Sequence, residues 1–215
     1  MKKINQESKL STLQFSTEDV EIVKKESLFE GFFKMVKYDF KHKLYEGGWS
    51  KVIEREVFER GNAVAVLLYD PALEEFVMIE QFRIGALSNP QSPWLLEVVA
   101  GIIDPDETPE NVCRREALEE AGVTIKKITP ALNYLPSPGG CTERLHLFVG
   151  EVDASQAGGV HGLEYESEDI LVHRVSVVDA MAWLEEGKID NSATIIVLQW
   201  FAMNKQKILD AWSNE

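Results

Sequence analysis

The sequence predicts an α/β protein preceded by a small antiparallel β domain, and three observations support this prediction. Residues 19–60 contain three segments in which apolar and charged residues partly alternate, as in strands with one solvated face. Residues 63–70 and 76–83 are apolar runs, which are typical of strands in the interior of a sheet. The end of the chain has apolar residues at three- and four-residue spacing, which indicates helices. We therefore expect a β domain over residues 1–60 and an α/β domain over residues 61–215.

Each expected element has a local signal. In the first domain the strands are expected at 19–29, 32–45 and 50–60, with Gly47 and Gly48 forming a turn. In the second domain we expect strands at 63–70, 76–83, 94–101, 126–135, 144–152 and 170–175, and helices at 109–121, 177–187 and 191–212. The helix at 109–121 is the best delimited, because Thr108 is a suitable N-cap, Pro109 suits the first position and Gly122 suits a left-handed C-terminal residue. Asn191 or Ser192 caps the last helix.

Composition and charge exclude several classes of partner. The 215 residues include 22 basic and 36 acidic side chains, which gives a net charge of −14, and no basic run offsets it. Such a surface repels polyanions, so nucleic acid is not an expected partner. No apolar window approaches the roughly 18 residues of a membrane span, and the first twenty residues lack an export signal. Cys113 and Cys141 have neither disulfide-framework nor zinc-ligand spacing. We expect a soluble cytoplasmic protein without a membrane partner.

The helix at 109–121 carries an unusual group of carboxylates. Glu116, Glu119 and Glu120 fall within an arc of roughly 100° on one side of this helix. The apolar residues on the other side, which we expect to pack on the core, are Ala117, Leu118 and Ala121. Like charges at i, i+4 repel each other, and hard divalent cations with oxygen ligands, Mg²⁺ in particular, remove that repulsion.

A charged helix of this kind can also be a solvated face with internal ion pairs. Gly101 and Glu107 precede the helix, and they favour a metal site instead through the motif that residues 101–123 match. Arg115 can orient one of the carboxylates, either Glu107 or Glu119, through a bidentate pair.

Residues 101–123 match the Nudix box, in which Gly, Glu, Arg-Glu, Glu-Glu and Gly recur at fixed spacing. Every charged and glycine position is filled, and Ala117 is smaller than the apolar residue common there. From about Asp19 to Trp212 the chain resembles the bacterial ADP-ribose pyrophosphatase branch of the Nudix family, in segments such as IEQFRIGA, PWLLEVVAGIID and SPGG. In that family a proline fifteen positions after the box marks ADP-ribose specificity, and Pro138 stands fifteen positions after Val123.

The resemblance implies a fold, a reaction and an assembly. The fold is an α/β/α sandwich around a mixed sheet, preceded by a small β domain exchanged between the subunits of a homodimer. The reaction is Mg²⁺-assisted attack of water on the diphosphate of ADP-ribose, with AMP and ribose 5-phosphate as products and Mn²⁺ as a substitute metal. A three-stranded sheet of some forty residues also has too little core to be stable alone, which independently favours a dimer.

The resemblance also implies roles for individual residues. The metal ligands would be Glu116, Glu120, Glu168 and the backbone carbonyl of Ala100. Glu166 would be the base that activates water, and Glu119, Glu120 and Arg115 would complete the catalytic group. Substrate contacts would come from Phe32, Phe33, Arg55, Glu56, Arg60, Arg83, Ile102, Ser137, Pro138, Gly139 and Glu143.

Alternatives remain at this stage. The enzyme could act on other ADP-sugars, a nucleotide sugar, a dinucleoside polyphosphate or a reduced nicotinamide dinucleotide, or the domain could be an inactive nucleotide-binding module. Glu164, Glu166, Glu168 and Asp169 crowd one loop, which could be a solvated acidic segment, and the residues alone do not select the base among them. Phe32 and Phe33 could be core residues.

Overall fold

The computed structural model describes residues 14–214 of the chain. The first thirteen residues, which belong to the expected β domain and to the segment without an export signal, lie outside the described residues, as does Glu215. The chain divides into two compact units. The first comprises residues up to Arg60 together with Ser137–Thr142, and the second comprises Gly61–Pro136 and the chain from Glu143 onward.

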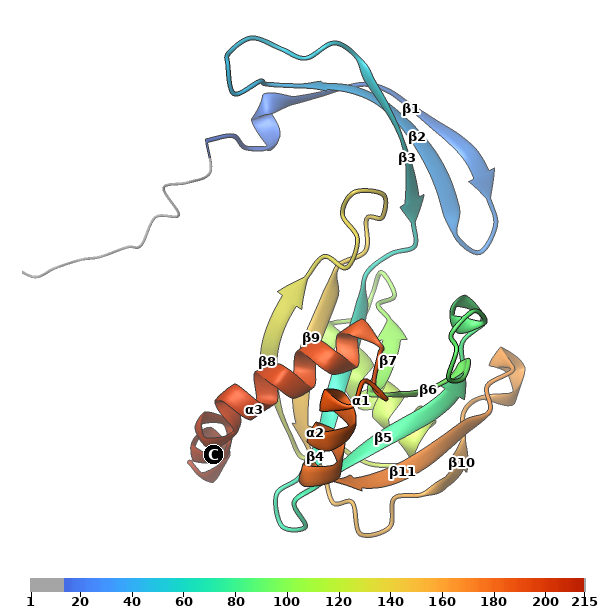
Figure 1. Ribbon diagram of the computed structural model, residues 1–215, viewed down its shortest axis with the longest axis vertical. Helices are drawn as coiled ribbons and strands as arrows, with labels where there is room; N and C mark the ends of the chain where they lie inside the picture. The colour runs from blue at the N-terminus through green and yellow to red at the C-terminus, as the bar shows by residue number, and fades with distance from the viewer. Residues whose placement is uncertain (1–13, 215) are drawn as a thin grey trace, which may run out of the picture. The chain divides into compact units, whose positions relative to one another are not determined.

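The first unit is a three-stranded antiparallel sheet in the order β1-β2-β3 (Figure 1). Its elements are the 3₁₀ helix η1 (Thr17–Asp19) and the strands β1 (Val20–Glu30), β2 (Lys34–His42) and β3 (Ile53–Glu59). Residues 137–142, which sequence reasoning assigned to the larger domain, join it because Phe58 donates its N–H to the Gly140 carbonyl at 2.8 Å and accepts from the Thr142 N–H at 3.1 Å. Among the described residues of this unit, Val36 is the only fully buried hydrophobic side chain.

The second unit is built on a mixed sheet. Its path is β10-β11-β5-β4-β9-β8, in which β4 and β9 are parallel and the other neighbours antiparallel. The strands are β4 (Ala63–Asp70), β5 (Glu75–Phe82), β6 (Trp94–Glu97), β7 (Val99–Ile102), β8 (Lys127–Tyr134), β9 (Leu145–Glu151), β10 (Gly159–His161) and β11 (Ile170–Ser176). The helices are α1 (Pro109–Ala121), α2 (Val177–Glu185) and α3 (Ser192–Ser213), with 3₁₀ helices η2 (Ile84–Ala86) and η3 (Glu164–Glu166).

Helices cover both faces of this sheet (Figure 1). Every residue of β4 is buried, and successive side chains serve two cores because they point to opposite faces. Ala65, Leu67 and Tyr69 pack with α2 and α3, whereas Val64 and Val66 pack with α1. The second unit is therefore an α/β/α sandwich, and the predicted fold class is confirmed.

One predicted strand is wrong in detail. Residues 94–101 were expected to form a single strand, but the segment divides at Val98 into β6 and β7. β6 pairs with β5 and β7 pairs with β4, so the segment passes from one central strand to the other. The division has a tertiary cause, because the Val98 N–H donates to Thr194 Oγ1 of α3 at 3.1 Å instead of to a neighbouring strand.

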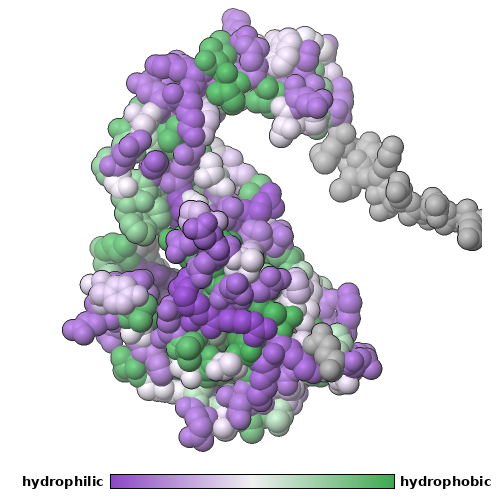
Figure 2. Space-filling model, turned by 180° about the vertical axis from the view of Figure 1, so that it is seen from behind, coloured by the Kyte–Doolittle hydropathy of each residue, from purple (hydrophilic) through white to green (hydrophobic). Residues whose placement is uncertain are grey.

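The face seen in Figure 2 mixes hydrophilic and hydrophobic residues on both units. Within residues 14–214, no helix has the length and apolar character needed to cross a membrane.

Candidate active site

Most of the predicted metal-binding and catalytic carboxylates lie on helix α1. The helix begins and ends at the residues that the sequence predicted. Thr108 Oγ1 accepts the Asn111 N–H at 3.3 Å, Pro109 occupies the first turn and Gly122 closes the helix in the left-handed region at φ +65°. The predicted helix over 109–121 and its caps are confirmed.

The buried face of α1 differs from the prediction. Leu118, which was expected to dock, is 59% exposed, whereas Glu120 is only 3% exposed. Two rows at i, i+4 spacing turn toward the sheet, one through Cys113, Ala117 and Ala121 and the other through Val112, Glu116 and Glu120. The carboxylates therefore lie at the edge of the packed face, where small side chains beside them let the helix approach the sheet.

Arg115 organises the carboxylates around it. Its Nε and Nη2 donate to the two oxygens of Glu107 at 3.2 and 3.0 Å, in a bidentate pair. Its Nη1 donates at 2.9 Å to both Glu116 Oε1 and Glu119 Oε2. From the sequence, either Glu107 or Glu119 was expected to pair with Arg115. In the structure the guanidinium binds both of them and Glu116 as well. Arg115 lowers the pKa of Glu107 through this hydrogen bond.

Two carboxyl groups of the helix, the buried Glu120 and the partly buried Glu116, are close to like charges. The pKa of Glu120 is raised to about 8, mainly by burial and in smaller part by the charges of Glu116 and Glu168. Burial likewise raises the pKa of Glu116 to about 7, with smaller contributions from Glu119 and Glu168. Glu120 Oε2 accepts the Ala100 N–H at 3.1 Å. The positive charge of Arg83 acts in the opposite direction on Glu120, which places that guanidinium within electrostatic reach of the box.

Gly101 of β7 makes room for Glu116. A Cβ at position 101 would lie 2.0 Å from Glu116 Oε1 and 2.4 Å from its Cδ. Any side chain there would displace the carboxylate, which explains in physical terms why glycine stands at this position of the box.

The loop after β10 carries the remaining acidic candidates. Glu168 Oε2 accepts the Leu163 N–H at 3.0 Å, and its charge still acts on Glu116 and Glu120. Glu166, the predicted base, is exposed on η3. The Gly162 N–H donates to the Glu119 carbonyl at 3.3 Å, which ties the start of this loop to the end of α1.

The donor set fits a divalent cation. Within residues 14–214, no three His, Cys, Asp or Glu side chains form a ready-made metal-binding cluster. Glu120 is nevertheless a buried carboxylate and Glu116 a partly buried one, and Glu168 is near enough to raise the pKa of both. Hard oxygen donors under mutual repulsion suit Mg²⁺ or Mn²⁺, which would stabilise the charged form of all three.

These pKa shifts predict how the stability of the metal-free protein depends on pH. The unfolded chain releases the protons of Glu116 and Glu120 near pH 4.5, whereas the folded chain keeps them to about pH 7 and 8. The stabilisation is therefore complete at low pH and is lost as the pH rises to about 8, at up to about 1.4 kcal/mol per pH unit for each carboxyl. Thermal unfolding in a chelator should show this loss, and Mg²⁺ should reverse it.

Glu120→Gln provides the control for that measurement, because an amide does not titrate. The decline between about pH 5 and about pH 8 should be shallower in this variant. An equal slope in both proteins would contradict the assignment of the decline to Glu120.

Eight of the eleven predicted substrate contacts belong to the first unit. Phe32 and Phe33 lie in the turn between β1 and β2 rather than on a strand, and Phe32 is 87% exposed. Phe33 packs edge-on against Phe58, with centroids 5.1 Å apart, and the Arg60 guanidinium lies over its ring at 5.4 Å. The other members of this group are exposed: Arg55 and Glu56 on β3, and Ser137, Pro138 and Gly139 in the loop that joins the unit.

The other predicted contacts belong to the second unit. Ile102 ends β7 and Glu143 is buried just before β9. Arg83 follows β5 and donates from Nε to Glu97 Oε2 at 2.8 Å. Glu97 is a buried carboxylate that the sequence reasoning missed. Its only signal was an acidic residue inside the apolar segment WLLEVVAG.

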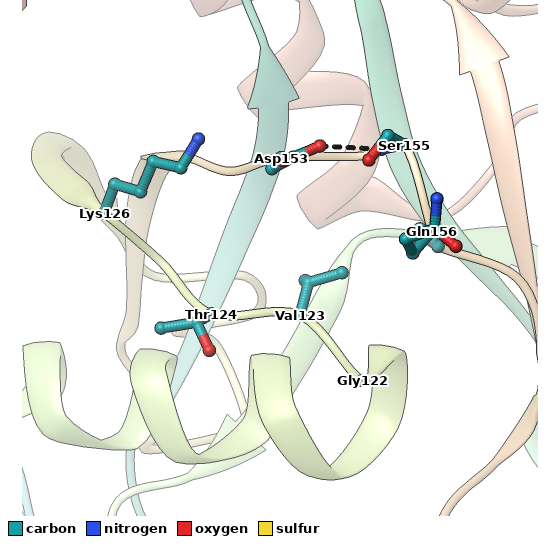
Figure 3. A pocket seen from close by; sticks show the side chains of 8 residues that line it. Gly122, Val123, Thr124, Lys126, Asp153, Ser155 and Gln156 are labelled. Carbon is teal, nitrogen blue, oxygen red and sulfur yellow. Dashed lines mark hydrogen bonds between the residues drawn. The ribbon is translucent and has the colours of Figure 1, made fainter.

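A surface pocket of about 380 Å³ lies elsewhere, at the C-terminal end of α1 (Figure 3). The turn after the helix, through Lys126, and the segment after β9, in which Asp153 accepts the Ser155 N–H, line it. None of the predicted site residues lines this pocket.

The fold and the carboxylate helix define a class of hydrolase, and comparison with known proteins agrees. A model of the NUDIX domain matches residues 59–196, and the chain belongs to the Nudix family. Nudix hydrolases generally use a divalent metal, in keeping with the oxygen donors of α1.

Particular relatives are similar over almost the whole chain. The ADP-ribose pyrophosphatase of Escherichia coli strain K12 is 50% identical over 199 residues, which cover 93% of this chain and 95% of that protein. The ADP-ribose pyrophosphatase of Haemophilus influenzae is 48% identical over 201 residues, covering 92% and 93%. A solved structure described as an ADP compounds hydrolase matches with a TM-score of 0.67 at 19% identity, covering 90% of this chain and 98% of that chain, and supports the fold.

Proposed function

We propose that this chain hydrolyses the diphosphate of ADP-ribose to AMP and ribose 5-phosphate. The observation that carries the proposal is the 50% identity, over 93% of the chain, to a protein named ADP-ribose pyrophosphatase. The complete box and Pro138, at the position that marks ADP-ribose specificity in the family, support it. We further propose a cytoplasmic location, which immunoblotting of cell fractions would test.

Mg²⁺ is the metal that we propose, with Mn²⁺ as a substitute. Glu116, Glu120, Glu168 and the Ala100 carbonyl would hold it. Support comes from the buried oxygen donors and the raised pKa values of Glu116 and Glu120. When bound, the cation would polarise the diphosphate and neutralise the charge that develops as the bridging bond breaks.

The protein's own residues would perform the remaining steps. Glu166 would accept a proton from water as the water oxygen bonds to a phosphorus, and the electron pair of the broken bond would leave with the other phosphate. Arg115 would hold Glu107, Glu116 and Glu119 in place, as its hydrogen bonds indicate. Arg83 would contact the diphosphate. Exposed aromatics such as Phe32 suit stacking on a base.

Product analysis on a substrate panel tests the proposal. The panel holds ADP-ribose, ADP-glucose, NADH and a diadenosine polyphosphate, each with and without Mg²⁺. We expect the highest kcat/KM for ADP-ribose, with AMP and ribose 5-phosphate as products and no turnover in a chelator. Faster turnover of another compound would overturn the substrate and keep the class, whereas no turnover at all would favour the nucleotide-binding module.

We also propose a homodimer in which the first unit packs on the partner and is exchanged between subunits. β1 has almost no buried side chain, and it exposes Ile22, Val23 and Phe29 to at least half of their area. A three-stranded sheet with one buried core residue in its described part has little to hold it together alone. Light scattering at micromolar concentration should give twice the mass of the chain, and a monomer there would refute the dimer.

A further inference from the structure

Glu97, at the end of β6, is a buried carboxylate with both oxygens engaged. It is 3% exposed. Its Oε2 accepts from Arg83 Nε at 2.8 Å, and its Oε1 accepts from Asn191 Nδ2 at 2.5 Å. A buried ionised carboxylate is retained only where partners satisfy it, so these two bonds determine where the group lies.

Asn191 is itself held in one orientation. As the N-cap of α3, its Oδ1 accepts the Thr194 N–H at 3.1 Å and the Thr194 hydroxyl at 3.2 Å. Thr194 Oγ1 in turn accepts the Val98 N–H at 3.1 Å. The amide oxygen therefore faces the helix, and the amide nitrogen must face Glu97. The start of α3 thus determines the position of the Glu97 carboxylate.

Glu97 in turn orients Arg83 through one nitrogen of the guanidinium, Nε. Glu97 binds Nε, and the guanidinium side chain is 42% exposed. Its charge acts on Glu120, so the guanidinium lies within electrostatic reach of the carboxylates of the box. A guanidinium fixed at Nε presents its two terminal nitrogens as a fork, which matches two oxygens of a phosphate.

We propose that Glu97, held by Asn191, is a positioning residue that orients Arg83 to bind the diphosphate of the substrate. This inference rests on the proposed function, because it assigns the recognition of a diphosphate to that same site. Preorganisation of this kind strengthens binding, since the rotamer freedom of the arginine is already lost before the ligand arrives.

Calorimetric titration with ADP, a nucleoside diphosphate, tests the inference without turnover. Glu97→Gln keeps the shape but places an amide donor against Asn191 Nδ2 or Arg83 Nε. We expect it to raise the Kd for ADP about tenfold, within the range for loss of a charge-assisted hydrogen bond. Arg83→Ala should raise it at least as much, and the double variant should bind no more weakly than Arg83→Ala alone.

Steady-state kinetics with ADP-ribose supply a second test. A merely structural role of Glu97 would not change KM selectively over kcat. Arg83 would bind the diphosphate equally before and during reaction, so Glu97→Gln should raise KM about tenfold and change kcat less than about threefold. Asn191→Ser keeps a capping oxygen on α3 but removes the amide donor to Glu97. It should therefore also raise KM, with little loss of thermal stability.

Glu75→Gln is the matched control. Glu75 accepts from Arg174 Nε at 2.8 Å, the same donor atom and distance as in the Arg83–Glu97 pair, at the other end of β5, and it is the more exposed carboxylate. It should leave the Kd and KM unchanged. The inference would be overturned if the double variant raised the Kd by the product of the two single effects, which would show that Glu97 and Arg83 act independently. An unchanged Kd in Glu97→Gln would also overturn it, and so would absence of ADP binding to the wild type. ADP binding without hydrolysis of ADP-ribose would contradict the proposed function alone.

Discussion

Glu120→Gln is expected to lower kcat/KM for ADP-ribose by about 10³-fold at saturating Mg²⁺. Loss of the proposed metal ligand would remove several kcal/mol of charge stabilisation, and each 1.36 kcal/mol is worth about tenfold in rate. The fold should survive, because the amide oxygen of glutamine can still accept the Ala100 N–H that now reaches Glu120 Oε2. In a chelator at high pH the variant should be the more stable protein, since it buries no charge at this position. Steady-state kinetics and thermal unfolding measure the two effects.

Glu110→Gln is the matched control for this substitution. Glu110 is an exposed carboxylate in the first turn of the same helix, so its replacement should leave kcat/KM within about twofold. If Glu120→Gln loses no more activity than this control, the assignment of Glu120 as a metal ligand is wrong.

Gly101→Ala is expected to lower kcat/KM about 10²-fold and to weaken Mg²⁺ binding, with little change in thermal stability. The new Cβ would lie 2.0 to 2.6 Å from Oε1, Cδ and Cγ of Glu116. Those atoms belong to a flexible side chain, so Glu116 can turn away and the sheet need not move. A ligand displaced by about an ångström loses its metal geometry, and misplacement on this scale has effects of this size. Kinetics over a range of Mg²⁺ concentrations would show a higher apparent Kd for the metal.

Gly85→Ala controls for the loss of glycine itself. Apart from its two chain neighbours, nothing lies within 4 Å of where a Cβ at position 85 would be, and the backbone there is not in the left-handed region. Activity and metal affinity should be unchanged there. Unfolding of Gly101→Ala would show instead that the contact with Glu116 supports the sheet, and unchanged Mg²⁺ affinity would show that Glu116 is not a ligand.

Much of the fold could be predicted because its signals are local. The helix over 109–121 carries its own N-cap, first-turn proline and left-handed glycine within the segment, so its ends needed no tertiary information. The run at 63–70 indicated a strand buried on both faces, and every residue of β4 is buried. The box spacing likewise follows from helical geometry, because residues four apart meet on one face.

Where the prediction differed, contacts distant in sequence were responsible. The apolar arc of α1 predicted that Leu118 would dock, but the sheet receives the row of Val112, Glu116 and Glu120. Residues 94–101 were predicted to form one strand, because their order does not show that the Val98 N–H donates to Thr194, in a helix far along the chain. Propensity and periodicity describe a segment alone, whereas these choices depend on what packs against it.

The sequence by itself determined the α/β class, the caps of α1 and the spacing that collects carboxylates and Arg115 on one helix, because each depends on residues within a few turns. Only the tertiary structure decided that Glu120 is buried against Ala100 and that Glu97 lies between Arg83 and Asn191. Arg83 and Asn191 are more than a hundred positions apart. Burial and pKa are properties of the packed interior, which folding assembles from segments that carry no local mark of one another.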